Sequence, residues 1–348
     1  TIRFRGIGPF CERGIGEIDA GRKMKEEVYL GIDTSCYTTS ILFMNRTGAA
    51  VAEARRILKV KPGRCGLQQS EMLYQHIRNL PELVEDAVKD HEFRILGIGV
   101  SARPRPREDS YMPAFLAGQG LARELSALYR VPLWQISHQE NHLEAAVWSA
   151  HGPCGKRFLA LHASGGTTDL LMAERPAEQE ESLYKGSYVL TEVGTSLDLH
   201  AGQFGDRVGV ALQLSFPAGP ALEVLAATAL ERVELPVSVH KTRVSLSGPC
   251  TAALRALQQG AAPAQLALGV QWVLAETFTR MIRNAAAQYD VKDVLLTGGV
   301  SANQWIRHQV EGKLAKRQIR VWVPESRFSG DNAAGCAHYA YRQGEAHD

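Results

Sequence analysis

The stretch that decides the fold is Leu159-Ala-Leu-His-Ala-Ser-Gly-Gly-Thr-Thr-Asp-Leu-Leu171. Its apolar first half predicts a buried β-strand, and the Gly165-Gly166 pair with its neighbouring hydroxyls predicts a tight turn. Glycines leave backbone N–H groups uncovered, so such a turn can surround a phosphate. Taken alone, the same turn could belong to a plain hairpin. The choice depends on whether similar units occur elsewhere in the chain.

Two similar units flank this stretch. The first is an apolar strand over 28–33 that ends at Asp33 and is followed by a hydroxyl-rich turn, in which Asp33, Thr34 and Ser35 are the phosphate-loop candidates. The other is a strand from Val294 that runs into Gly298-Gly299. In this order the three units resemble the two phosphate loops and the adenosine loop of the actin, sugar-kinase and heat-shock-chaperone ATPase superfamily. The resemblance implies an α/β fold with two actin-like lobes, mixed sheets flanked by helices, and a nucleotide cleft between the lobes.

The length of the chain and the position of its Gly-Pro breaks predict how it divides into domains. A chain of 348 residues is long enough for two domains. Residues 1–23 are rich in Gly and Arg and unpatterned, and we expect them to be an N-terminal extension outside the fold. Because Gly152-Pro153 is a typical break, we expect a first lobe over 24–152, with the first phosphate loop, and a second over 153–348, with the other two loops. The last helix is expected to start at Asp331 and to return towards the first lobe.

Strand-like and helix-like segments alternate along both predicted lobes, as in α/β proteins. The stretch 192–220 of the second lobe is assigned neither a helix nor a strand. Apolar spacing predicts helices over 70–89, 114–129, 137–150, 220–231, 251–259 and 266–288, and a hairpin over 184–190.

Composition narrows the class of protein. Apolar residues make up 45% and charged residues 22%, which is ordinary for a soluble globular protein. The net charge of +2 does not by itself indicate a nucleic-acid partner, although a local basic patch is compatible with it. No apolar run reaches the length of a membrane span, so we expect no membrane partner. The six cysteines are scattered without a Cys-x-x-Cys pair, which favours reduced thiols and a cytoplasmic location.

A histidine pair indicates a metal site. His138 and His142 are four residues apart in a predicted helix, so they lie on one face and can share a metal, although two surface histidines would give the same pattern. Asp331, in Ser-Gly-Asp-Asn-Ala-Ala, is the best third ligand. Two imidazoles and one carboxylate with open positions suit Fe(II) or Zn(II), and we expect one divalent metal, Fe(II) before Zn(II). Glu140 stands two residues after His138, which excludes the His-Glu-x-x-His protease motif.

The motifs taken together resemble the TsaD/Gcp family. They are His-x-x-x-His, Ser-Gly-Gly, Leu-x-Gly-Gly-Val-x-x-Asn and a late Asp-Asn-Ala-Ala, and the resemblance extends over 28–341. It implies a metal-dependent acyltransferase that moves a threonylcarbamoyl group from threonylcarbamoyl-AMP to N6 of the adenosine beside the anticodon of tRNA. It also implies an adenine nucleotide (threonylcarbamoyl-AMP or ATP), tRNA as a partner, a small paralogous partner protein and an ATPase.

The resemblance also implies roles for individual positions. The metal ligands fall on the two histidines and Asp331. The residues implied to bind the nucleotide are Ala163, Ser164, Gly165, Gly166, Thr167, Asp206, Gly219 and Asn303.

Several positions differ from the family's pattern. The first loop is Ser35-Cys-Tyr-Thr-Thr39, without the family's acidic residues, and Thr167 replaces a histidine. Arg103-Pro-Arg-Pro-Arg107 replaces a Gly-Pro-Gly loop, and it is either a solvated loop or a phosphate contact. Two alternatives therefore stay open: a paralogue that acts on another acceptor, and a non-catalytic nucleotide-binding scaffold, which the metal ligands disfavour. His162 and His200 are interpreted as structural.

Overall fold

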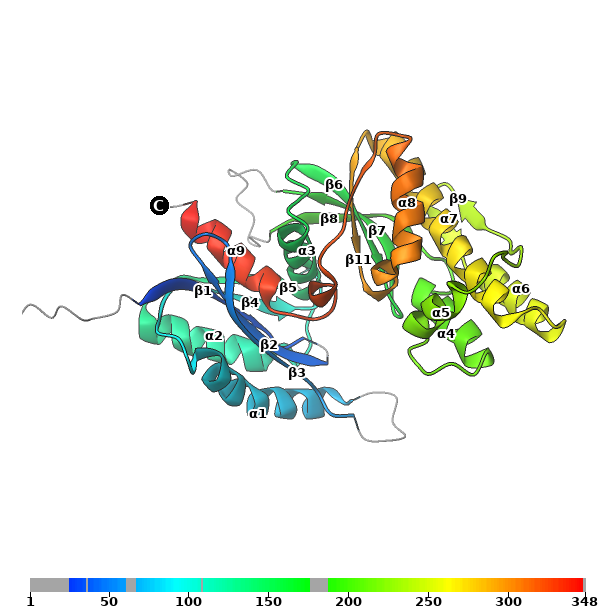
Figure 1. The fold of residues 1–348 in the computed structure, drawn as a ribbon. Coiled ribbons are helices and arrows are strands. Elements are labelled where there is room, and N and C mark those ends of the chain that lie inside the picture. Colours follow the sequence, from blue (N-terminus) through cyan, green and yellow to red (C-terminus); the bar gives the residue numbers. More distant parts are fainter. Residues whose placement is uncertain (1–24, 36, 61–66, 108, 176–186, 347–348) are drawn as a thin grey trace, which may run out of the picture.

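The computed structural model describes residues 25–35, 37–60, 67–107, 109–175 and 187–346, and the expected extension over 1–23 lies outside this part. Two five-stranded sheets form the frame of the molecule (Figure 1). Their strand orders are β3-β2-β1-β4-β5 and β12-β11-β6-β7-β8, and β9 pairs with β10. The strands are β1 (Glu26–Asp33), β2 (Thr38–Asn45), β3 (Ala50–Ile57), β4 (Phe93–Arg103), β5 (Leu133–Ser137), β6 (Arg157–Ala163), β7 (Thr168–Glu174), β8 (Val189–Thr195), β9 (Ser238–His240), β10 (Arg243–Ser245), β11 (Asp293–Thr297) and β12 (Arg320–Trp322).

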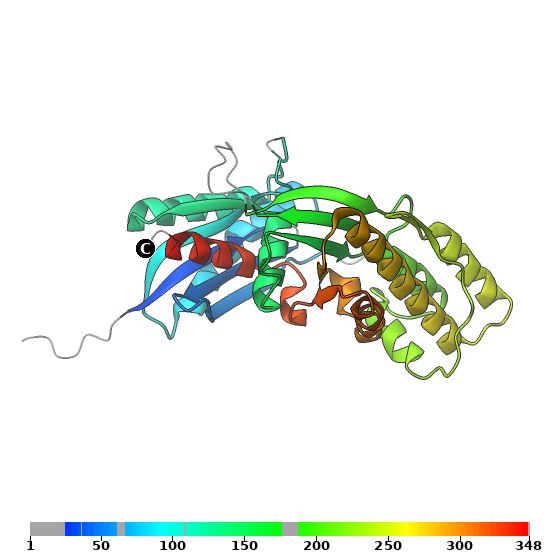
Figure 2. The same cartoon turned by 90° about the horizontal axis from the view of Figure 1, so that it is seen from above.

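Helices cover both sheets and join them (Figure 2). In each sheet the central strands are parallel, β1 with β4 and β6 with β11, and an antiparallel hairpin completes one side. Helices and 3-10 turns are α1 (Gln69–Val88), α2 (Phe115–Tyr129), α3 (His138–Ser149), α4 (Ala201–Ala211), α5 (Gly219–Ala226), α6 (Ser247–Gln258), α7 (Pro263–Tyr289), η1 (Gly299–Ala302), α8 (Gln304–Ala315), η2 (Ser326–Phe328) and α9 (Ala334–Glu345).

The last helix, α9, packs on the first sheet although it follows the second in sequence. Gly31 and Gly99 permit this contact, because a Cβ at Gly31 would lie 2.3 Å from the Ala333 carbonyl and one at Gly99 would lie 2.0 Å from the Cys336 carbonyl. The other face of that sheet forms a core with α1 and α2. Helix α9 also packs along α3, so these two helices connect the sheets.

Helix α3 covers one face of the second sheet. Its Leu143, Ala146 and Val147 form a core with Phe158 and Ala160 of β6. The opposite face packs against α7 and its neighbouring helices in the largest core of the molecule. The carboxyl ends of β1 and β6 are the strand ends to which the phosphate-loop candidates are attached.

Two predictions about helices need correction. The helix expected over 220–231 ends at Ala226, since residues 227–229 form tight turns that replace helical hydrogen bonds. The last helix starts at Ala334 and not at Asp331, because the Asn332 side chain accepts the Ala334 amide hydrogen bond at 2.9 Å.

Helix α4 lies within the stretch 192–220, to which no helix or strand was assigned from the sequence. Its glycines conceal it there, because glycine disfavours helices. In the fold they allow close packing, since a Cβ at Gly202 would lie 2.6 Å from the Gly165 amide nitrogen and one at Gly209 would lie 2.2 Å from the Ala218 Cβ. Within the described part of the chain, no helix combines the length and apolarity that a membrane crossing requires.

Candidate metal and nucleotide site

The N-terminus of α3, which carries the two histidines, is held in place by hydrogen bonds. Ser137 and Glu140 form a capping box: the Glu140 amide donates to the Ser137 hydroxyl at 3.2 Å, and the Ser137 amide donates to the Glu140 carboxylate at 2.8 Å. The second oxygen of this buried carboxylate accepts from the Ser187 amide at 2.7 Å. The helix therefore begins at His138 and is tied to the second lobe.

The two histidines of α3 meet Asp331 in space. His142 Nε2 lies 3.0 Å from His138 Nε2, and Asp331 Oδ1 lies 3.5 Å from His138 Nε2 and 3.3 Å from His142 Nε2. A tetrahedral site with metal–ligand bonds of about 2.0–2.1 Å places its ligand atoms about 3.3 Å apart. The donor set and its spacing therefore fit one divalent metal, and each residue keeps a partly exposed side.

Asp331 is held by the residues around it. The Asn141 amide group donates to the Asn332 carbonyl at 2.7 Å, and the Asn141 side-chain oxygen accepts from the Cys336 amide at 2.8 Å. Burial raises the pKa of the Asp331 carboxyl, but hydrogen bonds from the two histidines outweigh this effect and hold the pKa well below its usual range. The carboxylate is thus ionised and ready to bind a cation.

Asp33 lies behind the first histidine. Its carboxylate is buried and accepts hydrogen bonds from the Ser35 amide at 3.2 Å, the Ser35 hydroxyl at 2.8 Å and the Ser101 hydroxyl. Asp33 Oδ2 is 3.7 Å from His138 Nδ1. Asp33 therefore places a negative charge behind the His138 ring, at an ion-pair distance.

The other phosphate-loop candidates of the first turn are also inaccessible. Thr34 is fully buried, donates to the Ala114 carbonyl at 3.1 Å and accepts from the Gly118 amide at 3.0 Å. Ser35 is buried as well. In this conformation the side chains of Asp33, Thr34 and Ser35 therefore point into the protein.

His162 lies beside the metal ligands. Its ring centroid is 5.8 Å from that of His142, and its Nδ1 is 3.3 Å from the Thr297 hydroxyl. Burial, together with the positive charge of the neighbouring histidines, lowers the pKa of His162 to about 3, so the imidazole stays neutral. The sequence does contain the signal: side chains alternate along β6, and Ala160, two residues earlier, packs on the α3 side of the sheet.

The turn after β6 is open to solvent. It is closed by the Ser164 amide, which donates to the Thr167 carbonyl at 2.8 Å, while Gly165 and Gly166 are exposed with open space where a Cβ would stand. The Gly202 amide at the start of α4 donates to the Ser164 carbonyl at 2.9 Å.

The Gly-Gly loop after β11 lies against the same strand. Gly298 has a φ of +87°, which favours glycine, and a Cβ there would lie 2.4 Å from the Ala163 carbonyl. The structure therefore brings the second and third strand-and-turn units together.

The three remaining nucleotide candidates lie around α4, α5 and α8. Asp206 accepts a hydrogen bond from the Ala218 amide at 2.8 Å, next to Gly219 at the start of α5. Asn303 caps α8 by accepting from the Ile306 amide at 2.8 Å. The Gln304 amide donates to Glu223 of α5 at 2.7 Å, which holds the two helices side by side.

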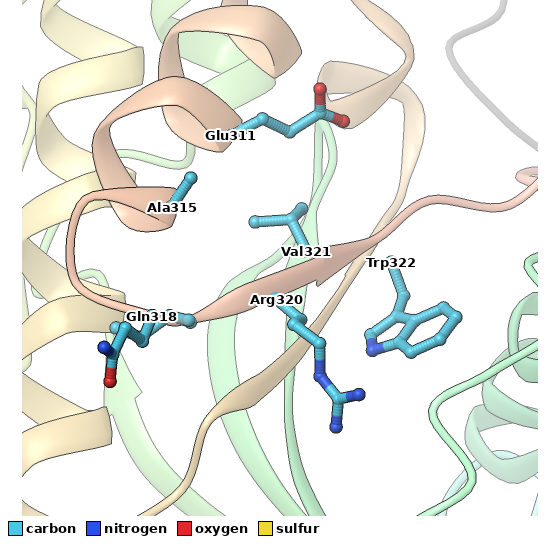
Figure 3. Close-up of a pocket in the computed structure, with 7 residues that line it drawn as sticks. Glu311, Ala315, Gln318, Arg320, Val321 and Trp322 are labelled. Carbon is cyan, nitrogen blue, oxygen red and sulfur yellow. The ribbon is translucent and has the colours of Figure 1, made fainter.

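A separate open pocket of about 560 Å³ lies between α8 and the edge strand β12 (Figure 3). Its lining includes Glu311, Arg320 and Trp322 and none of the candidate residues. It is therefore distinct from the metal and nucleotide site.

The fold itself is shared with solved structures. Component A of (R)-2-hydroxyglutaryl-CoA dehydratase from Acidaminococcus fermentans superposes with a TM-score of 0.52 at 17% identity, covering 91% of this chain and 99% of that one. Full-length HypF, bound to phosphate and nucleotide, gives a TM-score of 0.56 at 10% identity and covers 93% of this chain and 46% of that one. The predicted two-lobed actin-like ATPase fold is confirmed.

Sequence relatives are more specific. A tRNA N6-adenosine threonylcarbamoyltransferase of Thermus thermophilus is 30% identical over 90% of this chain and 92% of its own length. A probable bifunctional tRNA threonylcarbamoyladenosine biosynthesis protein of Methanothermobacter thermautotrophicus is 27% identical over 91% of this chain, which spans 57% of that longer protein. The family model described as TsaD, tRNA N6-adenosine threonylcarbamoyltransferase, matches residues 66–338. This chain therefore belongs to the TsaD family.

Proposed function

We propose that this protein is an acyltransferase that moves a threonylcarbamoyl group from threonylcarbamoyl-AMP to N6 of the adenosine beside the anticodon of tRNA. Membership of the TsaD family supports this activity. The observation that carries the proposal is the convergence of His138, His142 and Asp331 next to His162, which stands two residues before the open Ser164–Thr167 turn. The same region can thus bind a metal and an adenylate.

The metal would be held by the two imidazoles and the Asp331 carboxylate. When bound, it supplies a Lewis acid. Two histidines and one carboxylate with open positions favour Fe(II) over Zn(II). Asp33 places a negative charge behind the His138 ring, and the neutral His162 lies beside His142 without adding positive charge next to the ligands.

The nucleotide would be bound by the second lobe. The backbone amides of Gly165 and Gly166 are open to a phosphate, as the exposed glycines allow. Gly219 permits close approach of a ribose or base, because a side chain there would meet nothing within 4 Å. In the transfer, the N6–carbon bond forms, the bond from that carbon to the phosphate oxygen breaks, and AMP leaves while the amine gives up one proton.

Another acceptor is a second candidate. The observation in its favour is the first turn, where Tyr37 is 39% exposed at a position for which the family has an acidic residue. Thr167 likewise stands where the family has a histidine. A paralogue with the same metal and nucleotide sites would transfer the carbamoyl-type group to a different nucleophile.

The first lobe offers a surface for a protein partner. Tyr74 and Ile77 of α1 are 54% and 55% exposed, and Leu128 and Tyr129 at the end of α2 are 77% and 60% exposed. Exposed apolar side chains on two neighbouring helices are suited to a small paralogous partner protein. An ATPase partner is proposed from the family alone.

The test is a reconstitution with purified protein, threonine, bicarbonate, ATP, an adenylate-forming enzyme and unmodified tRNA. Mass spectrometry of the digested tRNA should detect threonylcarbamoyladenosine. A His138→Ala/His142→Ala variant should give none, and Arg317→Ala, an exposed change two residues beyond the end of α8, should match the wild type. Consumption of the adenylate without tRNA modification would favour the second candidate.

A further inference from the structure

An arginine-rich loop lies at the rim of the metal site and supplies none of its ligands. It follows β4 directly and consists of residues 103–107. Arg103 pairs with Ser137 in the register of β4 and β5, and the Pro104 carbonyl accepts a hydrogen bond from the Gln139 amide at 3.2 Å. Ser137 and Gln139 flank the first metal-binding histidine in sequence. The loop is thus anchored on both sides of a metal ligand.

The backbone of this loop is ordered in advance of any ligand. Pro104 and Pro106 each fix one φ angle. The Arg105 amide donates to the Ser110 hydroxyl at 3.0 Å, and the Arg107 amide donates to the Arg105 carbonyl at 2.8 Å. A loop that is already ordered loses less entropy when it binds a partner.

Two guanidinium groups of the loop face solvent. Arg107 makes a two-point ion pair with Asp109, with nitrogen–oxygen distances of 2.9 and 3.1 Å. Arg105 is exposed, and its side chain makes no hydrogen bond or ion pair within the described part of the chain. The planar guanidinium fork matches the oxygens of a phosphate, so this loop is suited to an anionic partner.

An exposed aromatic ring stands next to these cations. Tyr111 is 66% exposed and follows Ser110, the residue whose hydroxyl is bonded to the Arg105 backbone. Proteins that bind unpaired nucleotides combine cations for the phosphates with aromatic rings on which bases stack. An RNA loop offers successive phosphates together with unpaired bases, which matches two neighbouring arginines beside an exposed ring.

We propose that Arg105, Arg107 and Tyr111 bind the unpaired RNA nucleotides that flank the acceptor adenosine. Arg105 binds a backbone phosphate, Arg107 exchanges Asp109 for a second phosphate, and Tyr111 stacks on a base. The inference rests on the proposed function and adds to it the surface that places the RNA over the metal site.

The test is fluorescence anisotropy of the full chain with a labelled, unmodified tRNA at several salt concentrations. Arg105→Ala should weaken binding about fivefold or more and lower the salt slope by about 0.7, the value of one single-strand phosphate contact. Tyr111→Ala should weaken binding about fivefold or more at an unchanged slope. Asp109→Asn should strengthen binding, since it releases Arg107. Arg317→Ala, which removes an exposed arginine in the other lobe, is the matched control.

A parallel titration with AMP identifies the source of the phosphate. All four variants should bind AMP like the wild type, and a loss of AMP affinity in Arg105→Ala would overturn the RNA assignment. Unchanged tRNA binding in the folded Arg105→Ala and Tyr111→Ala proteins would overturn the loop proposal and leave the function intact. A wild-type protein that neither binds nor modifies tRNA would overturn both the loop proposal and the proposed function.

Discussion

The first and second hydroxyl-rich turns look alike in sequence and differ in the fold. The side chains of Asp33, Thr34 and Ser35 in the turn after β1 are buried. They form hydrogen bonds with one another and with neighbouring elements, so they are not accessible to a ligand. The turn after β6 is open, with Gly165 and Gly166 exposed. We infer from this difference that the first turn supports the metal ligands and that the second binds the phosphate.

Asp33→Asn should remove the support that the first turn gives to the metal ligands, and we expect it to have the largest effect. Loss of the charge behind His138 should lower the metal affinity about 10- to 100-fold, as is typical for partners behind metal-binding imidazoles. The measurement is a metal titration by calorimetry. The same variant should bind AMP like the wild type, and a matching loss of AMP affinity would mean that the first turn holds the phosphate.

Gly166→Ala should affect phosphate binding at the Ser164–Thr167 turn. A methyl group meets nothing within 4 Å in the folded protein and the backbone needs no positive φ, so stability should change by less than about 1 kcal/mol. The methyl would occupy the space of the phosphate and weaken AMP binding roughly tenfold, which is about 1.4 kcal/mol. Gly120→Ala, a change at another site with open space, serves as the control. Lower metal content in Gly166→Ala would contradict the division of roles.

His162 offers a smaller test, because it stands on the strand of the open turn but faces the metal ligands. Its folded pKa of about 3 lies below the ordinary value of 6.5, so the unfolded chain binds more protons between these values. Stability of the metal-free protein should therefore fall as the pH decreases below 6.5, by about 1–2 kcal/mol at pH 5. Urea denaturation of His162→Asn should show a shallower pH dependence. An identical pH dependence in the wild type and in His162→Asn would show that His162 does not cause the loss of stability at low pH.

The periodicity of apolar residues was sufficient to predict most of the helices that cover the two sheets. Helices α1, α2 and α7 occur within a few residues of their predicted bounds, because each carries an apolar stripe that packs on a sheet. Helix α4 could not be predicted, because its glycines lower helix propensity and the contacts that they permit, such as that of Gly202 with the Ser164–Thr167 turn, are remote in sequence.

The site was predictable only in part. The spacing of His138 and His142 is local, so the pair could be read from the sequence, whereas their approach to Asp331 depends on α9 packing along α3. The burial of the first turn and the position of His162 arise from contacts between lobes and strands that spacing does not encode. The nucleotide contacts assigned to Asp206, Gly219 and Asn303 remain predictions.

The most direct test of the account is whether a bound metal and a bound nucleotide are neighbours. Mn²⁺ in place of the native metal broadens the ³¹P resonance of a phosphate only at close range. We predict strong broadening of bound AMP in the wild type, and no broadening in His142→Ala with AMP still bound. Sharp ³¹P signals in a wild-type protein that holds both Mn²⁺ and AMP would show that the triad and the open turn do not form one site.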